Sequence, residues 1–150
     1  MNDQARFYRR RLPHWRETAA IYFVTWRLAP NQEELSPEER ELVAAELCHG
    51  HGRRYELHAY VVMNDHVHVL VEPRGEQVLE KLLHSWKSFT AHGLQRRSGR
   101  QGRIWQDEYF DRIARDEDEF ADKFEYIRGN PWKRWPELKG YAWVWPREEF

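Results

Sequence analysis

Apolar residues change their spacing in a regular order along this chain, and the changes predict its elements. An alternating or β-branched run predicts a strand, whereas apolar residues that recur every three or four positions predict an amphipathic helix. The pattern predicts strands at residues 21–26, 55–63, 66–72 and 104–113, and helices at residues 37–47, 76–94 and 116–129.

The order of these elements is β-α-β-β-α-β followed by one more helix. It predicts an α+β fold of the ferredoxin-like (RRM-like) type, in which an antiparallel sheet carries two helices on one face. A length of 150 residues suits a single domain. We therefore expect one domain over residues 1–150, with a basic arm at 1–18 and a tryptophan-rich tail at 132–150.

Local signals mark the ends of several elements. Ser36 and Pro37 are a typical N-cap and first helical residue. Asn64 and the aspartate after it are expected to form the tight turn of a hairpin. Residues that precede proline avoid the helical region, so the last helix is expected to end near Asn130, before Pro131.

Two histidines, His66 and His68, lie in a strand rich in β-branched residues. Because strand side chains alternate between faces, both imidazoles should project from one face, and Val67, Val69 and Val71 from the face that the two helices cover. The pair could hold a metal ion, but a solvated or core pair has the same pattern. Two imidazoles suit zinc, copper or nickel as well as manganese.

The last predicted helix carries a second polar pair, Tyr126 and Asn130. Four residues apart, they share one face if the helix persists that far. Tyr126 is a candidate nucleophile, and Tyr109 in the strand at 104–113 is the alternative. Ordinary roles remain open for each: helix packing for Tyr126, a core or base-stacking aromatic for Tyr109, and a helix cap for Asn130.

Charge is close to balanced, at −1, but it is segregated along the chain. Acidic residues gather near predicted helix starts and are interpreted as solvated faces. Arginines crowd the first segment and residues 96–103, a glycine-containing stretch that we interpret as a mobile loop. The candidate phosphate-binding side chains are Arg9, Arg10, Arg11, Lys87, Arg96, Arg97, Arg100 and Arg103.

The chain has eight tryptophans, more than one small core readily hides. Four of them follow the last helix, at positions 132, 135, 143 and 145. We expect some to be exposed, where they could stack on bases or pack the tail over the domain, and both alternatives stay open.

Composition also excludes several classes of protein. No apolar stretch approaches the roughly 20 residues of a membrane span, and no secretory signal is recognisable, so we expect a cytoplasmic protein without a membrane partner. Cys48 is the only cysteine, which excludes an intrachain disulfide and a multi-cysteine zinc site.

An ordered set of short motifs resembles the HUH-type single-tyrosine transposases, and more closely the REP-associated tyrosine transposases of bacteria. The motifs are RLPHW at 11–15, YFVTWRL at 22–28, AYVVMNDHVH at 59–68, KSFT at 87–90, IWQDEYFDR at 104–112 and YIRGNP at 126–131. Where the family usually has proline and asparagine before the first histidine, this chain has Asn64 and Asp65.

The resemblance implies an enzyme in which a tyrosine hydroxyl attacks single-stranded DNA, leaving a 5′-phosphotyrosine and a free 3′-hydroxyl that can later rejoin DNA without ATP. It implies Tyr126 as the nucleophile, with Mg²⁺ or Mn²⁺ held by His66, His68 and Asn130. The implied partner is hairpin DNA from repetitive extragenic palindromes, gripped in part by the basic arm. We expect a monomer that supplies its own tyrosine, although exchange of the tyrosine helix between two subunits would leave the same sequence pattern.

Two other functions fit the same residues. A non-catalytic module could bind single-stranded nucleic acid on the open face of the sheet, without metal dependence. A metal-dependent nuclease that uses water would need His66 and His68 but not Tyr126.

Overall fold

The computed structural model of the chain describes residues 20–147. The predicted basic arm, with Arg9, Arg10 and Arg11, lies outside the described residues. In chain order the elements are β1 (Ile21–Leu28), α2 (Pro37–His49), β2 (Tyr55–Val62), β3 (His66–Pro73), α3 (Leu79–Ser98), β4 (Trp105–Ala114), α4 (Glu117–Arg134) and β5 (Val144–Trp145).

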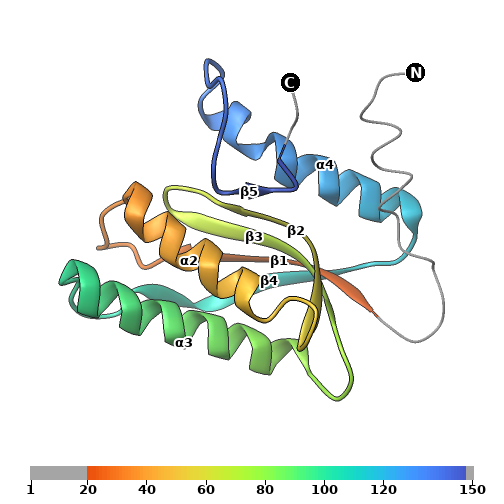
Figure 1. Cartoon of the computed structure of the whole chain (residues 1–150), viewed down its shortest axis with the longest axis horizontal. Helices are drawn as coiled ribbons and strands as arrows, with labels where there is room; N and C mark the ends of the chain where they lie inside the picture. The colour runs from red at the N-terminus through yellow and green to blue at the C-terminus, as the bar shows by residue number, and fades with distance from the viewer. Residues whose placement is uncertain (1–19, 148–150) are drawn as a thin grey trace.

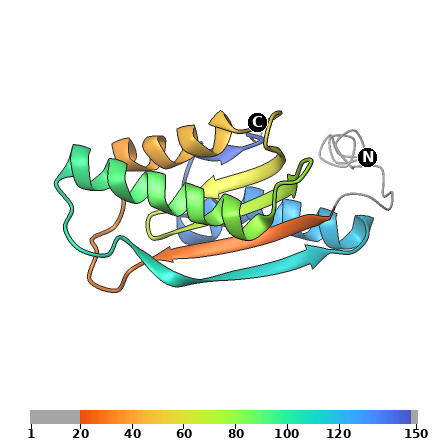
Figure 2. The same ribbon diagram turned by 90° about the horizontal axis from the view of Figure 1, so that it is seen from below.

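The strands form one sheet in the order β4-β1-β3-β2-β5, with every neighbouring pair antiparallel. Helices α2 and α3 lie on one face of the sheet, and α4 crosses the other (Figure 1). Figure 2 shows α2 and α3 side by side over the strands. The predicted ferredoxin-like order is confirmed, and β5 is an addition that the apolar pattern did not predict.

Strand alternation divides the apolar side chains between two cores. Val67, Val69 and Val71 pack in the core beneath α2 and α3. Leu70 belongs to the second core, which α4 covers with Phe120 and other apolar residues. Because His66 and His68 are in phase with Leu70, their face is the one beneath α4, as the alternation predicts.

Helix α4 begins where the sequence predicts but ends later. The Asp116 carboxylate accepts a hydrogen bond from the Glu119 backbone N–H at 2.8 Å and caps the first turn. The expected end near Asn130 is wrong, because the helix continues through Pro131 to Arg134. Asn130 and Pro131 are buried, and the Trp135 N–H still donates to the Pro131 carbonyl at 2.8 Å. Packing thus outweighs the local cost of a proline inside a helix.

The segment interpreted as a mobile loop is partly helical and is anchored. Arg96 and Arg97 lie in the last turn of α3, and Gly99 ends the helix with a φ of +68°, which favours glycine. The Arg100 side chain donates to Glu39 Oε1 at 2.8 Å and to the Glu33 carbonyl at 2.7 Å. Arg100 therefore fastens this segment to the start of α2.

The ion pair between Glu39 and Arg100 should make the fold sensitive to acid. The Arg100 hydrogen bond lowers the pKa of Glu39 to about 2 from an ordinary 4.5. A carboxyl with a lowered pKa stabilises the fold above the unfolded-state value, and this stabilisation is lost as the pH falls from about 4.5 towards 2. Glu39→Gln should lower the free energy of unfolding by about 2 kcal/mol at pH 7.

Urea denaturation of both proteins at several pH values measures this effect. The difference between Glu39→Gln and the unmodified protein should shrink below pH 4.5. An equal difference at pH 7 and pH 3 would contradict a role for the ionised carboxylate. Glu38→Gln, on the exposed side of the same first turn, is the matched control.

The four tryptophans from the end of α4 onwards pack rather than project. Trp132, Trp135, Trp143 and Trp145 are half-buried against the two cores. The β5 strand pairs with β2, and the Trp143 indole N–H donates to a Glu41 carboxylate oxygen at 3.0 Å. Within residues 20–147 the packing alternative is therefore favoured over exposed, base-stacking tryptophans. The same range contains no helix of the length and apolarity that a bilayer span requires.

Candidate active site

The two predicted histidines and the predicted tyrosine lie together between the sheet and α4. The rings of His66 and His68 are 4.6 Å apart, measured between centroids. The Tyr126 ring lies 5.2 Å from the His68 ring. Phe23 on β1 contacts both, at 5.4 Å from His68 and 5.9 Å from Tyr126. Residues from β1, β3 and α4 thus converge on one point.

His68 is buried with one ring nitrogen engaged and the other without a partner. Its Nδ1 lies 2.7 Å from Thr25 Oγ1, whereas its Nε2 is buried and has no hydrogen-bond partner in the described structure. Burial, followed by the charges of His66, Arg27 and Lys123, lowers the pKa of His68 to about 3. The imidazole is therefore neutral at neutral pH. If Nδ1–H donates to Thr25, the Nε2 lone pair is free to bind a cation.

His66 is also held through its Nδ1 atom, but by a different group. Its Nδ1 lies 2.6 Å from Asp65 Oδ1. An ionised carboxylate only accepts hydrogen bonds, so Nδ1–H donates and Nε2 carries the lone pair. A carboxylate that orients a histidine in this way is typical of metal sites, where it raises the basicity of the ligand. Asp65 is also where the chain departs from the family pattern.

Asn130 lies one turn beyond Tyr126 and is 7% exposed. Helix α4 crosses the face of the sheet that carries the histidines and packs mainly against β2 (Figure 1). His66 pairs with Arg27, farther along β1 than Thr25, which pairs with His68. Asn130 thus follows Tyr126 on the helix that crosses the histidine face, and its approach to the imidazole pair stays a prediction.

This donor set fits a divalent cation with open coordination positions. Within residues 20–147, no three side chains of histidine, cysteine, aspartate or glutamate converge on one point. The two Nε2 atoms and an amide oxygen would leave positions for water and phosphate oxygens. The unpartnered Nε2 of buried His68 is the observation that favours a ligand here.

A cleft of about 570 Å³ opens beside Tyr126 and His68. It is floored by β1 and β4, and Tyr126 is 38% exposed at its wall. The Lys123 ammonium lies 4.9 Å from the centre of the Phe23 ring, and the Lys133 ammonium 4.6 Å from the centre of the Tyr126 ring. Positive charge at the cleft favours a phosphate there.

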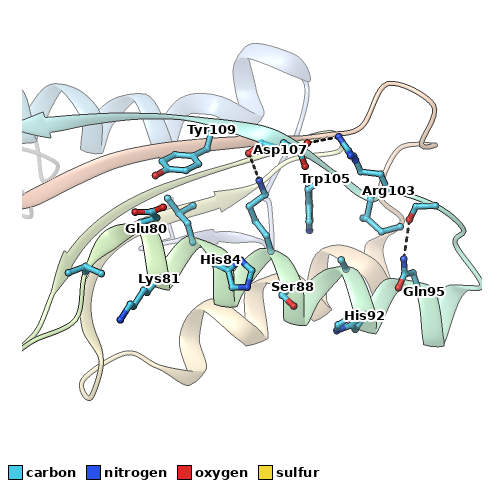
Figure 3. Close-up of a pocket in the computed structure, with 16 residues that line it drawn as sticks. Glu80, Lys81, His84, Ser88, His92, Gln95, Arg103, Trp105, Asp107 and Tyr109 are labelled. Carbon is cyan, nitrogen blue, oxygen red and sulfur yellow. Dashed lines mark hydrogen bonds and ion pairs between the residues drawn. The ribbon is translucent and has the colours of Figure 1, made fainter.

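The alternative nucleophile lies across the sheet. Tyr109 pairs with Trp26 in the β1–β4 ladder, so its side chain is on the α3 face. Figure 3 shows it beside Glu80 in a second cleft, of about 750 Å³, between α3 and β4. Burial and the carboxylates of Asp111 and Glu80 raise the pKa of Tyr109. The structure does not bring Tyr109 to the histidine pair.

Some of the predicted phosphate-binding side chains are already engaged in hydrogen bonds or ion pairs within the protein. The Lys87 ammonium donates to the carbonyls of Gln106 at 2.6 Å and Asp107 at 3.1 Å, and burial lowers its pKa. Arg103 pairs with the Asp107 carboxylate at 2.6 Å. The guanidinium of Arg100 is anchored as described above. Their DNA contacts, with those of exposed Arg96 and Arg97, stay predictions.

Two contributors to the site were not predicted from the sequence. Thr25 holds His68 from β1, and Phe23 packs against both His68 and Tyr126. A polar residue inside the otherwise apolar first strand was a signal for Thr25. Its partner could not be inferred without the register between β1 and β3.

A histidine pair on a central strand, facing a tyrosine on a crossing helix, is the arrangement that the resemblance to tyrosine transposases implies. The family model for IS200-like transposases matches residues 31–130. The chain therefore belongs to the IS200-like transposase family. A search of curated proteins found no match.

Two solved structures share the fold. One is a REP-associated tyrosine transposase bound to a REP hairpin, with a TM-score of 0.69 and 19% identity over 88% of this chain and 81% of that one. The other is a candidate transposase from Deinococcus radiodurans R1, with a TM-score of 0.52 and 18% identity over 77% of this chain and 93% of that one. The predicted fold and membership of a transposase family are confirmed, and the closer likeness to REP-associated transposases stays a prediction.

Proposed function

We propose that this chain cleaves single-stranded DNA beside a hairpin and rejoins it through a covalent bond to Tyr126. The observation that carries the proposal is the Tyr126 ring, 5.2 Å from His68, whose buried Nε2 has no partner in the described structure. Membership of a transposase family supports DNA as the substrate. The REP hairpin bound to the similar solved transposase supports a hairpin as the recognised element.

The proposed reaction conserves a phosphoester bond. The Tyr126 hydroxyl oxygen attacks the phosphorus, the bond from phosphorus to the 3′-oxygen breaks, and that oxygen leaves as a hydroxyl with the proton lost by the phenol. The product is a 5′-phosphotyrosine with a free 3′-hydroxyl. Attack by a 3′-hydroxyl on this link reverses the proton and bond changes, so religation needs no ATP.

The side chains around Tyr126 suit each requirement of this reaction. A phenol has a pKa near 10, so it must lose its proton as the new bond forms. Phe23 and His68 pack against the Tyr126 ring and fix its orientation. Lys123 and Lys133 place positive charge beside the cleft, where it favours both the phosphate and the developing phenolate.

His66, His68 and Asn130 are the side chains that would hold Mg²⁺ or Mn²⁺. A bound divalent cation supplies stabilisation of the charge that builds on the phosphate oxygens. Thr25 and Asp65 hold the imidazoles with both Nε2 atoms available. Because the tyrosine lies beside the histidines of the same chain, a monomer contains every group that the reaction uses.

Asp65→Asn tests whether the carboxylate supports the cation site. The amide can still accept from His66 but lacks the negative charge, so the affinity for Mn²⁺ should fall about 10-fold, at the lower end of such effects. Isothermal titration calorimetry with MnCl₂ measures the affinity. Asp107→Asn, which removes an exposed carboxylate on the α3 side, should leave it unchanged. Equal affinities for all three proteins would contradict a supporting role for Asp65.

The proposed function is tested with a hairpin oligonucleotide that carries a single-stranded flank and a different label at each end. With Mn²⁺ or Mg²⁺, the fragment downstream of the cut should stay attached to the protein after denaturation, and EDTA should prevent this. Cleavage without an attached fragment would favour the water-using nuclease. Hairpin binding without cleavage would favour the non-catalytic module. Either result would contradict the proposal.

A further inference from the structure

Phe110 on β4 is a large apolar side chain that the fold leaves exposed. Its side chain is 56% exposed. In the β1–β4 ladder Phe110 pairs with Thr25, whose hydroxyl contacts His68. Its side chain therefore lies on the histidine face of the sheet, beyond the part that α4 covers.

Phe110 is also fixed close to the candidate nucleophile. Its ring contacts Phe23 edge-on, with centroids 6.4 Å apart, and Phe23 in turn contacts Tyr126 at 5.9 Å. Phe110 and Tyr126 both line the cleft of about 570 Å³. A group that stacks on Phe110 would therefore lie in the same cleft as the Tyr126 phenol, with Phe23 in contact with both rings.

The charges in this cleft favour a nucleic acid strand. Two cations, Arg27 and Lys123, line it together with one carboxylate, Glu108. An aromatic ring beside cations is the pattern with which proteins hold single strands, because any base can stack on the ring while the phosphates contact the charges. A protein partner would require a continuous apolar surface, whereas the cleft around Phe110 is interrupted by Arg27, Lys123 and Glu108.

We propose that Phe110 stacks on a nucleobase next to the scissile phosphate and so aligns that phosphate with Tyr126. This inference rests on the proposed function and adds a positioning residue to it. Stacking tolerates any base, so Phe110 would set the path of the strand rather than its sequence.

The contact is tested by removing the Phe110 ring from the protein and, separately and together, single bases from the DNA. Hairpin oligonucleotides carry one abasic site at successive positions of the single-stranded flank, and binding is measured by fluorescence anisotropy. All measurements use Tyr126→Phe protein, so no cleavage is needed. Phe110→Ala should weaken binding about 10-fold, and an abasic site at one position should weaken it similarly. At that position the two losses should not add, because both remove the same contact.

Two further variants keep the test specific. Phe110→Tyr retains an aromatic ring and should restore binding. Ile113→Ala removes an apolar side chain of the same strand that is 45% exposed, but on the α3 face, where it pairs with Tyr22. It should bind as tightly as the parent.

Three results would overturn the inference about Phe110. The first is a Phe110→Ala affinity within twofold of the parent's on every oligonucleotide, intact or abasic. The second is a loss of affinity in Ile113→Ala equal to that in Phe110→Ala. The third is a lower Tm for Phe110→Ala without weaker DNA binding. Because the cleavage-inactive background is used throughout, none of these results bears on Tyr126. Conversely, failure to form the covalent adduct would overturn the proposed reaction and leave the stacking measurement standing.

Discussion

Tyr126→Phe is expected to abolish the covalent protein–DNA adduct and to leave hairpin binding unchanged. The substitution removes only the hydroxyl oxygen that attacks phosphorus, so the rate of adduct formation should fall by about 10³-fold or more. The ring contacts with His68 and Phe23 remain, and the side chain is 38% exposed, so the fold should be unaffected. Denaturing electrophoresis measures the adduct, and fluorescence anisotropy measures binding.

Tyr109→Phe is the matched control for this prediction. It removes the same hydroxyl from a tyrosine with a similar exposed fraction, 37%, on the opposite face of the sheet. This variant should form the adduct at the rate of the unmodified protein. An adduct that persists in Tyr126→Phe and disappears in Tyr109→Phe would mean that the nucleophile has been assigned to the wrong face.

His68→Ala is expected to remove the dependence of cleavage on Mn²⁺ together with most of the cleavage itself. The substitution deletes the Nε2 atom that is buried without a partner in the described structure, and with it a ligand of the proposed cation. Losing one of two imidazoles should weaken Mn²⁺ binding by about 100-fold or more, beyond the effect of a supporting residue. Cleavage rates across a Mn²⁺ titration measure the change.

His58→Ala controls for the general cost of removing an imidazole beneath α4. His58 lies on β2, where it contacts the Glu72 carboxylate at 3.1 Å and the Phe120 ring, and burial lowers its pKa. This variant should lose stability and keep the Mn²⁺ dependence of cleavage. The same Mn²⁺ titration curve for His68→Ala and the unmodified protein would contradict cation binding at His68.

Periodicity in the sequence predicted those features of the site that lie within a single strand or helix. Alternation along β3 placed His66 and His68 on one face, and helical spacing along α4 placed Asn130 one turn after Tyr126. Both features follow from backbone geometry within a few residues. They could therefore be predicted without knowing how the elements pack.

Other features depended on contacts between distant parts of the chain. The register of β4 against β1 puts Tyr109 on the α3 face and Phe110 on the histidine face, and no local pattern fixes that register. Burial of Pro131 keeps α4 helical past the point where local preference would end it. The ion pair of Arg100 with Glu39, 61 positions away, likewise could not be inferred from the arginine cluster that predicts phosphate binding.

The tail shows the same limit. A count of eight tryptophans predicted exposed rings, but β5 folds the tail back along β2 and half-buries Trp143 and Trp145. The exposed aromatic beside the candidate site is Phe110 instead. Composition thus predicted exposed aromatic side chains but could not say which residues they are.

Mass spectrometry of the trapped adduct tests the central claim most directly. After digestion with a protease and a nuclease, one peptide should carry the mass of a 5′-linked nucleotide, and fragmentation should place it on Tyr126. Attachment at Tyr109 or at any other residue, in an adduct that requires Mn²⁺ or Mg²⁺, would contradict the proposed alignment of Tyr126 with the histidine pair.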